Sequence, residues 1–106
     1  MFSFKVSKNK YVGVLTVFVS VSFDVVSPDS KLQIKQALIE YGFKKIHDTH
    51  YESFDFLPTQ LGGLKKDLAL FLDSDDKLRI YQYPLENSFK ISYIEEKKWK
   101  RLSISV

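Results

Sequence analysis

The residue best placed to do chemistry in this sequence is Asp24, a carboxylate that ends an apolar run. The run spans 11–24, reads YVGVLTVFVSVSFD, and is rich in valine, which favours a pleated backbone over a helix. It is shorter than the roughly 18 residues that a membrane span needs, so we expect a central strand over 12–23. Sheets of mixed α/β proteins tend to place functional groups where such a strand ends beside a helix. The alternative is that Asp24 caps a backbone turn.

His47 and His50 are the two histidines of the chain. Three positions apart on one strand, they would point to opposite faces, so we do not expect them to share a metal. One of them could act as a general base, although a surface histidine without such a role is more common. Asp48 and His50 would share a face, and we interpret that pair as incidental. The chain has no cysteine, which excludes disulfides and thiolate chemistry and is typical of a reducing cytoplasm.

Two sets of basic residues could contact a phosphate backbone. Such contacts add salt-dependent affinity without reading sequence, and the alternative is a solvated charged face. A net charge of +3 is compatible with nucleic acid but not diagnostic of it. The set nearer the end of the chain, the second one given below, could equally be a contact in a strand-swapped dimer. The first set comprises Lys31, Lys35, Lys44, Lys45 and Arg79. The second set comprises Lys97, Lys98, Lys100 and Arg101, with Trp99 among them.

Two segments carry the i, i+3, i+4, i+7 apolar spacing of helices. We expect the first helix over 28–41, because Ser27 is a suitable N-cap and Pro28 suits the first helical position. Gly42 is a natural stop. We expect the second helix over 59–72. Two consecutive glycines in its first turn are each unfavourable by roughly 1 kcal/mol against alanine, which predicts close packing or an irregular start.

The rest of the chain alternates as strands joined by polar segments. Residues 1–10 read as a polar lead-in that forms either a short edge strand or a flexible arm. We expect an acidic turn over 73–76 and a charged connector, which contains Trp99, over 95–100. Further strands are expected over 43–56, through a bend, and over 78–83, 89–93 and 102–106.

This order of elements predicts one α+β domain over 1–106. It is the split βαβ pattern of a ferredoxin-like sandwich, with two helices on one face of an antiparallel sheet. Aromatic residues make up 15% of the chain, more apolar surface than one small core hides, so we expect a homodimer. The sheet face without helices would be the contact, and the segment 95–106 could be swapped between the subunits.

Several short motifs resemble the small CRISPR-associated subunit of spacer acquisition, a family with a ferredoxin-like fold and reported endoribonuclease members. The first strand ends in Phe23-Asp24 and the first helix ends near Tyr41-Gly42. The segment 46–52, IHDTHYE, follows, and 75–81, DDKLRIY, joins an acidic turn to a strand. The family usually has arginines on its first helix, where this chain has lysines. The virulence-associated D ribonucleases, which share the fold, are a related alternative.

The resemblance implies that Asp24 binds a divalent metal, Mg²⁺ or Mn²⁺, and is the catalytic residue of a metal-dependent endonuclease. One carboxylate per subunit, with substrate phosphate, is chemically sufficient for magnesium. It also implies a cytoplasmic, antiviral homodimer that binds duplex DNA or RNA and bridges CRISPR integrase subunits, with no membrane partner.

Three functions therefore stay open. The first is a subunit of CRISPR adaptation that binds duplex DNA without sequence preference. The second is a toxin-like, metal-dependent endoribonuclease. The third is a ferredoxin-like assembly module that binds no nucleic acid.

Overall fold

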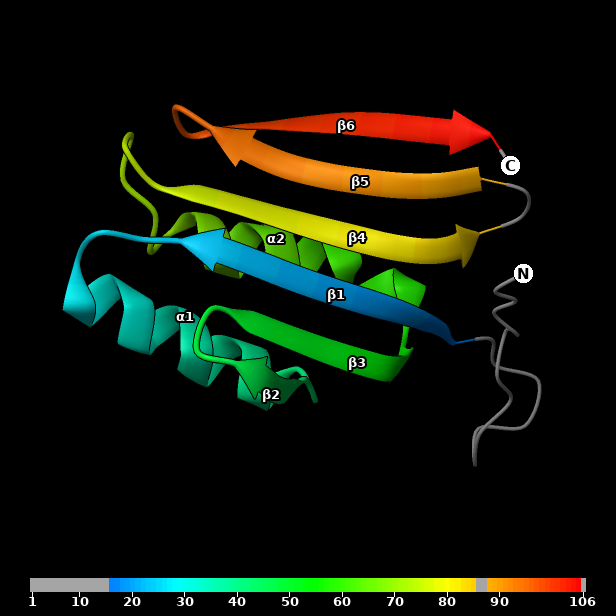
Figure 1. The fold of residues 1–106 in the computed structure, drawn as a ribbon, viewed down its shortest axis with the longest axis horizontal. Coiled ribbons are helices and arrows are strands. Elements are labelled where there is room, and N and C mark those ends of the chain that lie inside the picture. Colours follow the sequence, from blue (N-terminus) through cyan, green and yellow to red (C-terminus); the bar gives the residue numbers. More distant parts are fainter. Residues whose placement is uncertain (1–15, 86–87, 106) are drawn as a thin grey trace.

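A computed structural model describes residues 16–85 and 88–105, which form one sheet and two helices (Figure 1). The lead-in over 1–10 and the first residues of the expected strand over 12–23 lie outside the described residues. The elements in chain order are β1 (Val17–Asp24), α1 (Pro28–Glu40), β2 (Lys44–His47), β3 (His50–Phe56), the 3₁₀ turn η1 (Pro58–Gln60), α2 (Leu61–Ala69), β4 (Lys77–Leu85), β5 (Ser88–Glu95) and β6 (Lys98–Ser105).

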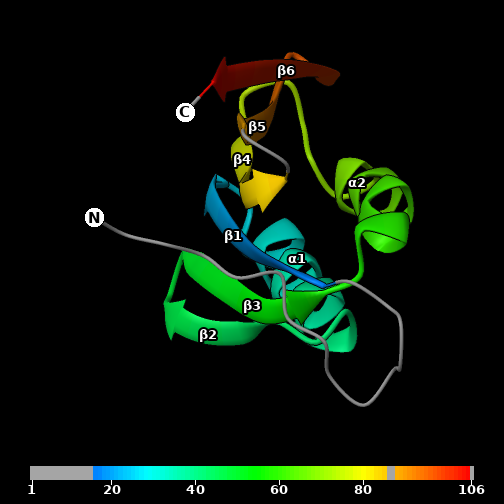
Figure 2. The same cartoon turned by 90° about the vertical axis from the view of Figure 1, so that its right-hand side faces the viewer.

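The six strands form a single sheet in the order β2-β3-β1-β4-β5-β6, and every neighbouring pair is antiparallel. Figure 2 shows the sheet nearly edge-on, with α1 and α2 on the same side of it. The expectation of an α+β domain with two helices on one face of an antiparallel sheet is therefore confirmed. Strands β5 and β6 extend the sheet beyond β4, the strand that follows α2.

The apolar run becomes β1, which is paired on both sides, with β3 and β4. Its alternate side chains Val19, Val21 and Phe23 point toward the helices and are buried. They pack in one core with apolar residues of both helices, including Ile34 and Leu64. A strand that is paired on both edges and buried on one face gains most of its stability from this packing rather than from propensity. The predicted strand is confirmed, and it extends one residue further, to Asp24.

Helix α1 begins where the capping residues predict. Ser27 is the N-cap, and its hydroxyl accepts a hydrogen bond from the Ser30 amide at 3.3 Å. The helix ends at Glu40, one residue before the predicted end, because Tyr41 is the C-cap. Gly42 follows with a φ of 90°, a conformation that favours glycine and ends the helix.

The second helix is shorter than predicted and begins as the 3₁₀ turn η1 before becoming α2. Gly63 permits a close approach to the end of α1: a Cβ at this position would lie 3.1 Å from the Tyr41 hydroxyl oxygen. That hydroxyl donates a 2.7 Å hydrogen bond to Asp67, which is the main cause of the raised pKa of Tyr41. Of the two alternatives, close packing holds at Gly63, and the irregular start is the 3₁₀ turn over Pro58–Gln60 that precedes the glycines.

The structure resolves two sequence-based expectations about connections. The segment 43–56 is a hairpin of β2 and β3, as the two-stranded form of the split βαβ pattern requires, and not one strand with a bend. The charged connector over 95–100 is a tight turn, in which Glu96 and Lys97 adopt φ of 50° and 64°. Positive φ at both central residues matches the turn that suits a twisted two-residue hairpin. Trp99 therefore lies within β6, where it packs against the core.

Asp76 joins two loops at the end of the sheet where β1 ends. It is buried, and its two carboxylate oxygens accept hydrogen bonds from the Val26 amide at 3.0 Å and the Asp73 amide at 2.8 Å. The first amide belongs to the loop between β1 and α1, and the second to the turn before β4. The acidic turn predicted over 73–76 thus contains a carboxylate with a structural role. The sequence alone does not distinguish this residue from the other carboxylates of the turn.

We predict that Asp76→Ala lowers the free energy of unfolding by about 3 kcal/mol, because it leaves two backbone donors without their charged acceptor. Asp75→Ala, which removes an exposed carboxylate from the same turn, should change it by no more than about 0.5 kcal/mol. Urea unfolding followed by circular dichroism measures both values. Equal effects of the two substitutions would contradict the assigned role of Asp76.

Candidate nucleic-acid interface

Asp24 lies where the sequence predicts, exposed at the end of the central strand β1, with three residues between it and the start of α1. Its register partner on β4 is Lys77. The amides of Val26 and Ser30 in the following loop bond to Asp76 and Ser27 rather than to Asp24. Within 16–85 and 88–105, no group of three or more His, Asp or Glu residues could hold a metal ion. What Asp24 offers chemically is one accessible carboxylate.

Three of the predicted phosphate-binding lysines gather around Asp48, in the turn between β2 and β3. The Lys35 ammonium donates a 2.5 Å hydrogen bond to the Asp48 carboxylate, and the Lys45 ammonium lies 3.7 Å from it. Both interactions, with a smaller contribution from Lys31, lower the pKa of Asp48. We call Lys31, Lys35, Lys45 and Asp48 the basic edge. Its net charge is +2, from three ammonium groups and one carboxylate.

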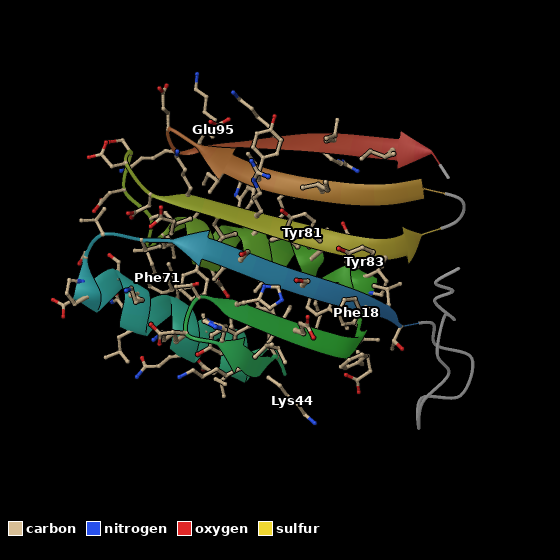
Figure 3. All side chains as sticks on the ribbon, viewed as in Figure 1. Phe18, Lys44, Phe71, Tyr81, Tyr83 and Glu95 are labelled. Carbon is tan, nitrogen blue, oxygen red and sulfur yellow. The ribbon has the colours of Figure 1, made fainter. Side chains whose placement is uncertain are left out.

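The other two residues of that predicted set lie elsewhere, so the five cations do not form one track. Arg79 lies on β4, and its side chain shares the strand face of Ser22, its register partner on β1. Lys44 pairs with Glu52 on β3 and extends from the lower border of the sheet in Figure 3. Side chains of directly paired residues share a face, and this face is the one opposite the helices. The structure therefore does not bring the five cations of the first set together on one surface.

We call the sheet face opposite α1 and α2 the open face; it is turned toward the viewer in Figure 1. No helix within 16–85 and 88–105 covers it. Cross-strand register arranges its side chains in lines that run perpendicular to the strands. The line through Ser22 crosses the sheet and reaches His47 on β2, the register partner of His50, and we call its five members on β3, β1, β4, β5 and β6 the central row. Its members, from β3 to β6, are His50, Ser22, Arg79, Tyr93 and Lys100.

Aromatic rings occupy the open face beside the central row. The ring centroids of Phe18 and Phe54 are 4.8 Å apart, and those of Phe18 and Tyr83 are 5.5 Å apart. Phe54 is 67% exposed, a large fraction for a phenylalanine. Tyr83 is partly buried, and this burial is the main cause of its raised pKa. Figure 3 shows Phe18 and Tyr83 close together, with Tyr81 further along β4.

His50 is held by two neighbours on the same face. Its Nε2 atom lies 3.1 Å from the Ser20 hydroxyl and 3.0 Å from a Glu52 carboxylate oxygen. A serine–histidine–acid relay needs the serine and the acid on opposite ring nitrogens, so this cluster is not arranged for acyl transfer. The predicted separation of the two histidines is also wrong. They lie on adjacent strands as register partners, and Asp48 bonds to Lys35 rather than sharing a face with His50.

The predicted second basic set is divided by the alternation of β6. Trp99 and Arg101 face the helices, and the Lys65 ammonium of α2 lies 4.9 Å from the Trp99 ring centroid. Burial, with Arg101 nearby, lowers the pKa of Lys65. Lys98 and Lys100 face the other way, onto the open face. A single phosphate track through all these residues is therefore excluded.

The central row was not predicted, because it requires the register of five strands. Its signals were nevertheless in the sequence. Arg79, Tyr81 and Tyr83 occur at alternate positions, as do Ile91 and Tyr93, so each strand places an aromatic or basic stripe on one face.

Comparisons with protein-family models, with curated proteins and with solved structures each find no match to this chain. Among the described residues, neither α1 nor α2 is long and apolar enough to cross a membrane.

We predict that the Asp48 side chain titrates below the usual range for aspartate and that Lys35→Ala returns it toward that range. Because the pKa is lowered in the folded state, the interaction stabilises the protein above the unfolded-state pKa of this carboxyl. That stability is lost as pH falls through the lowered folded value. Carbon-detected NMR of the side-chain carboxyls measures the titration. An unchanged Asp48 midpoint in Lys35→Ala would contradict the assigned cause.

Proposed function

We propose that this chain is a nucleic-acid-binding subunit that contacts the phosphate backbone of duplex DNA through its basic edge. The observation that carries the proposal is the convergence of Lys31, Lys35 and Lys45 from α1 and β2 on one side of the molecule. Lysines bind phosphate as point charges and read no sequence. The proposed duplex binding is therefore independent of sequence and strongly dependent on salt.

Asp48 does not prevent this contact. The pair of Asp48 with Lys45 is exposed on both sides, and surface ion pairs contribute only about 0–1 kcal/mol. A phosphate can therefore displace the carboxylate from Lys45 at little cost, whereas the 2.5 Å hydrogen bond to Lys35, whose side chain is 22% exposed, is the stronger competitor. Asp48 would instead set the strength of binding, since its charge offsets one of three ammonium groups.

The resemblance to the small CRISPR spacer-acquisition subunit supplies the wider role. In that role, the chain would bridge integrase subunits in the cytoplasm while they handle duplex DNA. The ferredoxin-like arrangement is supported by the first four strands, in which β1 lies between β3 and β4. Helix α1 connects β1 to β2, helix α2 connects β3 to β4, and both helices lie on the same face of the sheet. The hairpin of β5 and β6 is an addition to that pattern.

A homodimer belongs to the same proposal, and we assign its contact to the edge of β6. This strand ends the sheet, and Leu102 and Ile104 on it are 49% and 47% exposed. Pairing of two β6 strands would join the sheets of the two subunits. The open face is a less suitable contact than the sequence suggested, because burying Arg79 and Glu52 there would cost desolvation energy.

Metal-dependent cleavage by Asp24 stands as the second candidate function, in the manner of a toxin-like endoribonuclease. The observation in its favour is an exposed carboxylate at the end of the central strand. Mg²⁺ or Mn²⁺ would need further oxygens from substrate phosphate or from Asp24 of a second copy. The metal would supply the activated water and offset the charge that develops on the phosphate. An assembly module that binds no nucleic acid is the third candidate, and it predicts no salt-dependent DNA binding.

We predict that replacing Lys31 and Lys35 together by alanine weakens binding of all duplexes about tenfold and lowers the salt slope by about 2. Asp48→Asn should strengthen binding, because it removes the one negative charge of the basic edge. The matched control replaces Lys66 and Lys98, two exposed lysines outside that edge, by alanine. Fluorescence anisotropy with labelled duplexes across a salt series measures each effect. Equal losses in the two double variants would contradict binding at the basic edge.

We predict that any cleavage of labelled DNA or RNA requires Mg²⁺ or Mn²⁺, stops with EDTA and is abolished by Asp24→Asn. The substitution keeps the shape of the side chain but removes its charge, so folding and duplex binding should persist. Asp29→Asn, which changes an exposed aspartate at the start of α1, is the control. Cleavage that survives Asp24→Asn would exclude a catalytic role for this residue. A wild-type protein that cleaves neither DNA nor RNA would contradict the nuclease and favour the binding subunit without nuclease activity.

A further inference from the structure

We propose that the central row of the open face is a second binding site, specific for single-stranded nucleic acid and separate from the basic edge. A phosphate would lie over Ser22, between His50 and Arg79, and an unpaired base would stack on Tyr93. This goes beyond duplex binding, because it uses other residues on the opposite side of the sheet.

Ser22 has the shortest side chain of the central row. It is directly paired with His50 on β3 and with Arg79 on β4, and paired residues on adjacent strands lie about 5 Å apart. The small serine therefore separates two longer side chains that both point away from the helices. The Ser22 hydroxyl and the Arg79 guanidinium can donate hydrogen bonds to phosphate oxygens, whereas the Nε2 atom of His50 already contacts Ser20 and Glu52.

The guanidinium of Arg79 is kept on this face by its neighbour on the same strand. A side-chain hydrogen bond with Tyr81 is the main cause of the raised pKa of Arg79. Arg79 is also exposed, so the remaining donors of its planar fork can reach a ligand. Arginine in this position binds a phosphate through two parallel hydrogen bonds, which lysine cannot do.

Tyr93 supplies the stacking surface. It is paired with Arg79 on β4 and with Lys100 on β6, so two cationic residues flank its partly exposed side chain, and the Lys100 ammonium lies 3.8 Å from the Glu95 carboxylate. An aromatic ring flanked by cations is the combination by which proteins hold single strands, with the bases on the ring and the backbone on the charges. Because a duplex hides the faces of its bases, this arrangement selects single strands over duplexes.

Charge also favours this occupant over an apolar partner or a second copy. Among the described residues of the open face, the cations Lys44, Lys77, Arg79, Lys98 and Lys100 face the anions Asp24, Glu52 and Glu95. Five cations and three anions leave a net charge of +2. A polyanion gains from such a face, whereas a copy of the same face would bring equal charges together.

The test measures fluorescence anisotropy with labelled single-stranded DNA and RNA of about 12 nucleotides, a length that one such surface covers. We expect Arg79→Gln and Tyr93→Ser each to weaken binding of single strands about tenfold, while affinity for the matching duplex is unchanged. Arg101→Gln is the matched control, because it removes the same charge from the helix-covered face. Tyr93→Phe keeps the ring and should keep the affinity.

Circular dichroism and light scattering accompany each variant, so that misfolding and changes of assembly are recognised. Equal losses in Arg79→Gln and Arg101→Gln, or a wild type that binds duplexes only, would overturn the proposal. So would a dimer that dissociates in Arg79→Gln, because the open face would then bind a second copy. We expect replacement of Lys31 and Lys35 to weaken duplex binding and to leave the binding of single strands unchanged. This result would show that the two sites are distinct and that each proposal can be tested without the other.

Discussion

The pairing of β1 on both of its edges is the constraint on which the rest of the structure depends. A strand in this position has one face for the core and one face that the helices leave uncovered. The valines of β1 fill the first, against α1 and α2. The second carries Ser20 and Ser22, which are small and polar, with longer side chains on either side from β3 and β4. The register of β1 thus determines which side chains form the core and where short and long side chains lie on the open face.

The same register separates the charged groups of the chain into two surfaces. Helix α1 and the turn between β2 and β3 bring three lysines around Asp48, whereas β4, β5 and β6 carry Arg79 and Lys100 to the opposite side. Alternation along β6 also keeps Arg101 away from Lys100, although the two are adjacent in sequence. Clusters of basic residues in a strand are therefore a poor guide to a continuous phosphate track. In this chain each such cluster contributes to both faces of the sheet.

The sequence was sufficient for the features that depend on neighbouring residues. The N-cap at Ser27, the stop at Gly42 and the valine-rich central strand are local in this sense. It was not sufficient for features set by pairing between distant segments. The hairpin turn at Glu96 and Lys97 has no glycine to mark it, and Asp76 differs from its acidic neighbours only by burial. The central row needs five strands in register, which no local pattern specifies, so Tyr93 and His50 could not be placed beside Arg79 in advance.

Binding at two separate surfaces is tested most directly by backbone amide NMR of the labelled protein, titrated in parallel with a duplex and with a single strand of the same sequence. The duplex should shift the amides around Lys31, Lys35 and Lys45 and leave those around Ser22 and Tyr93 in place. The single strand should shift Ser22, Arg79 and Tyr93 and leave α1 unchanged. One common set of shifted amides for both ligands, or no shift at either surface, would contradict two-site binding.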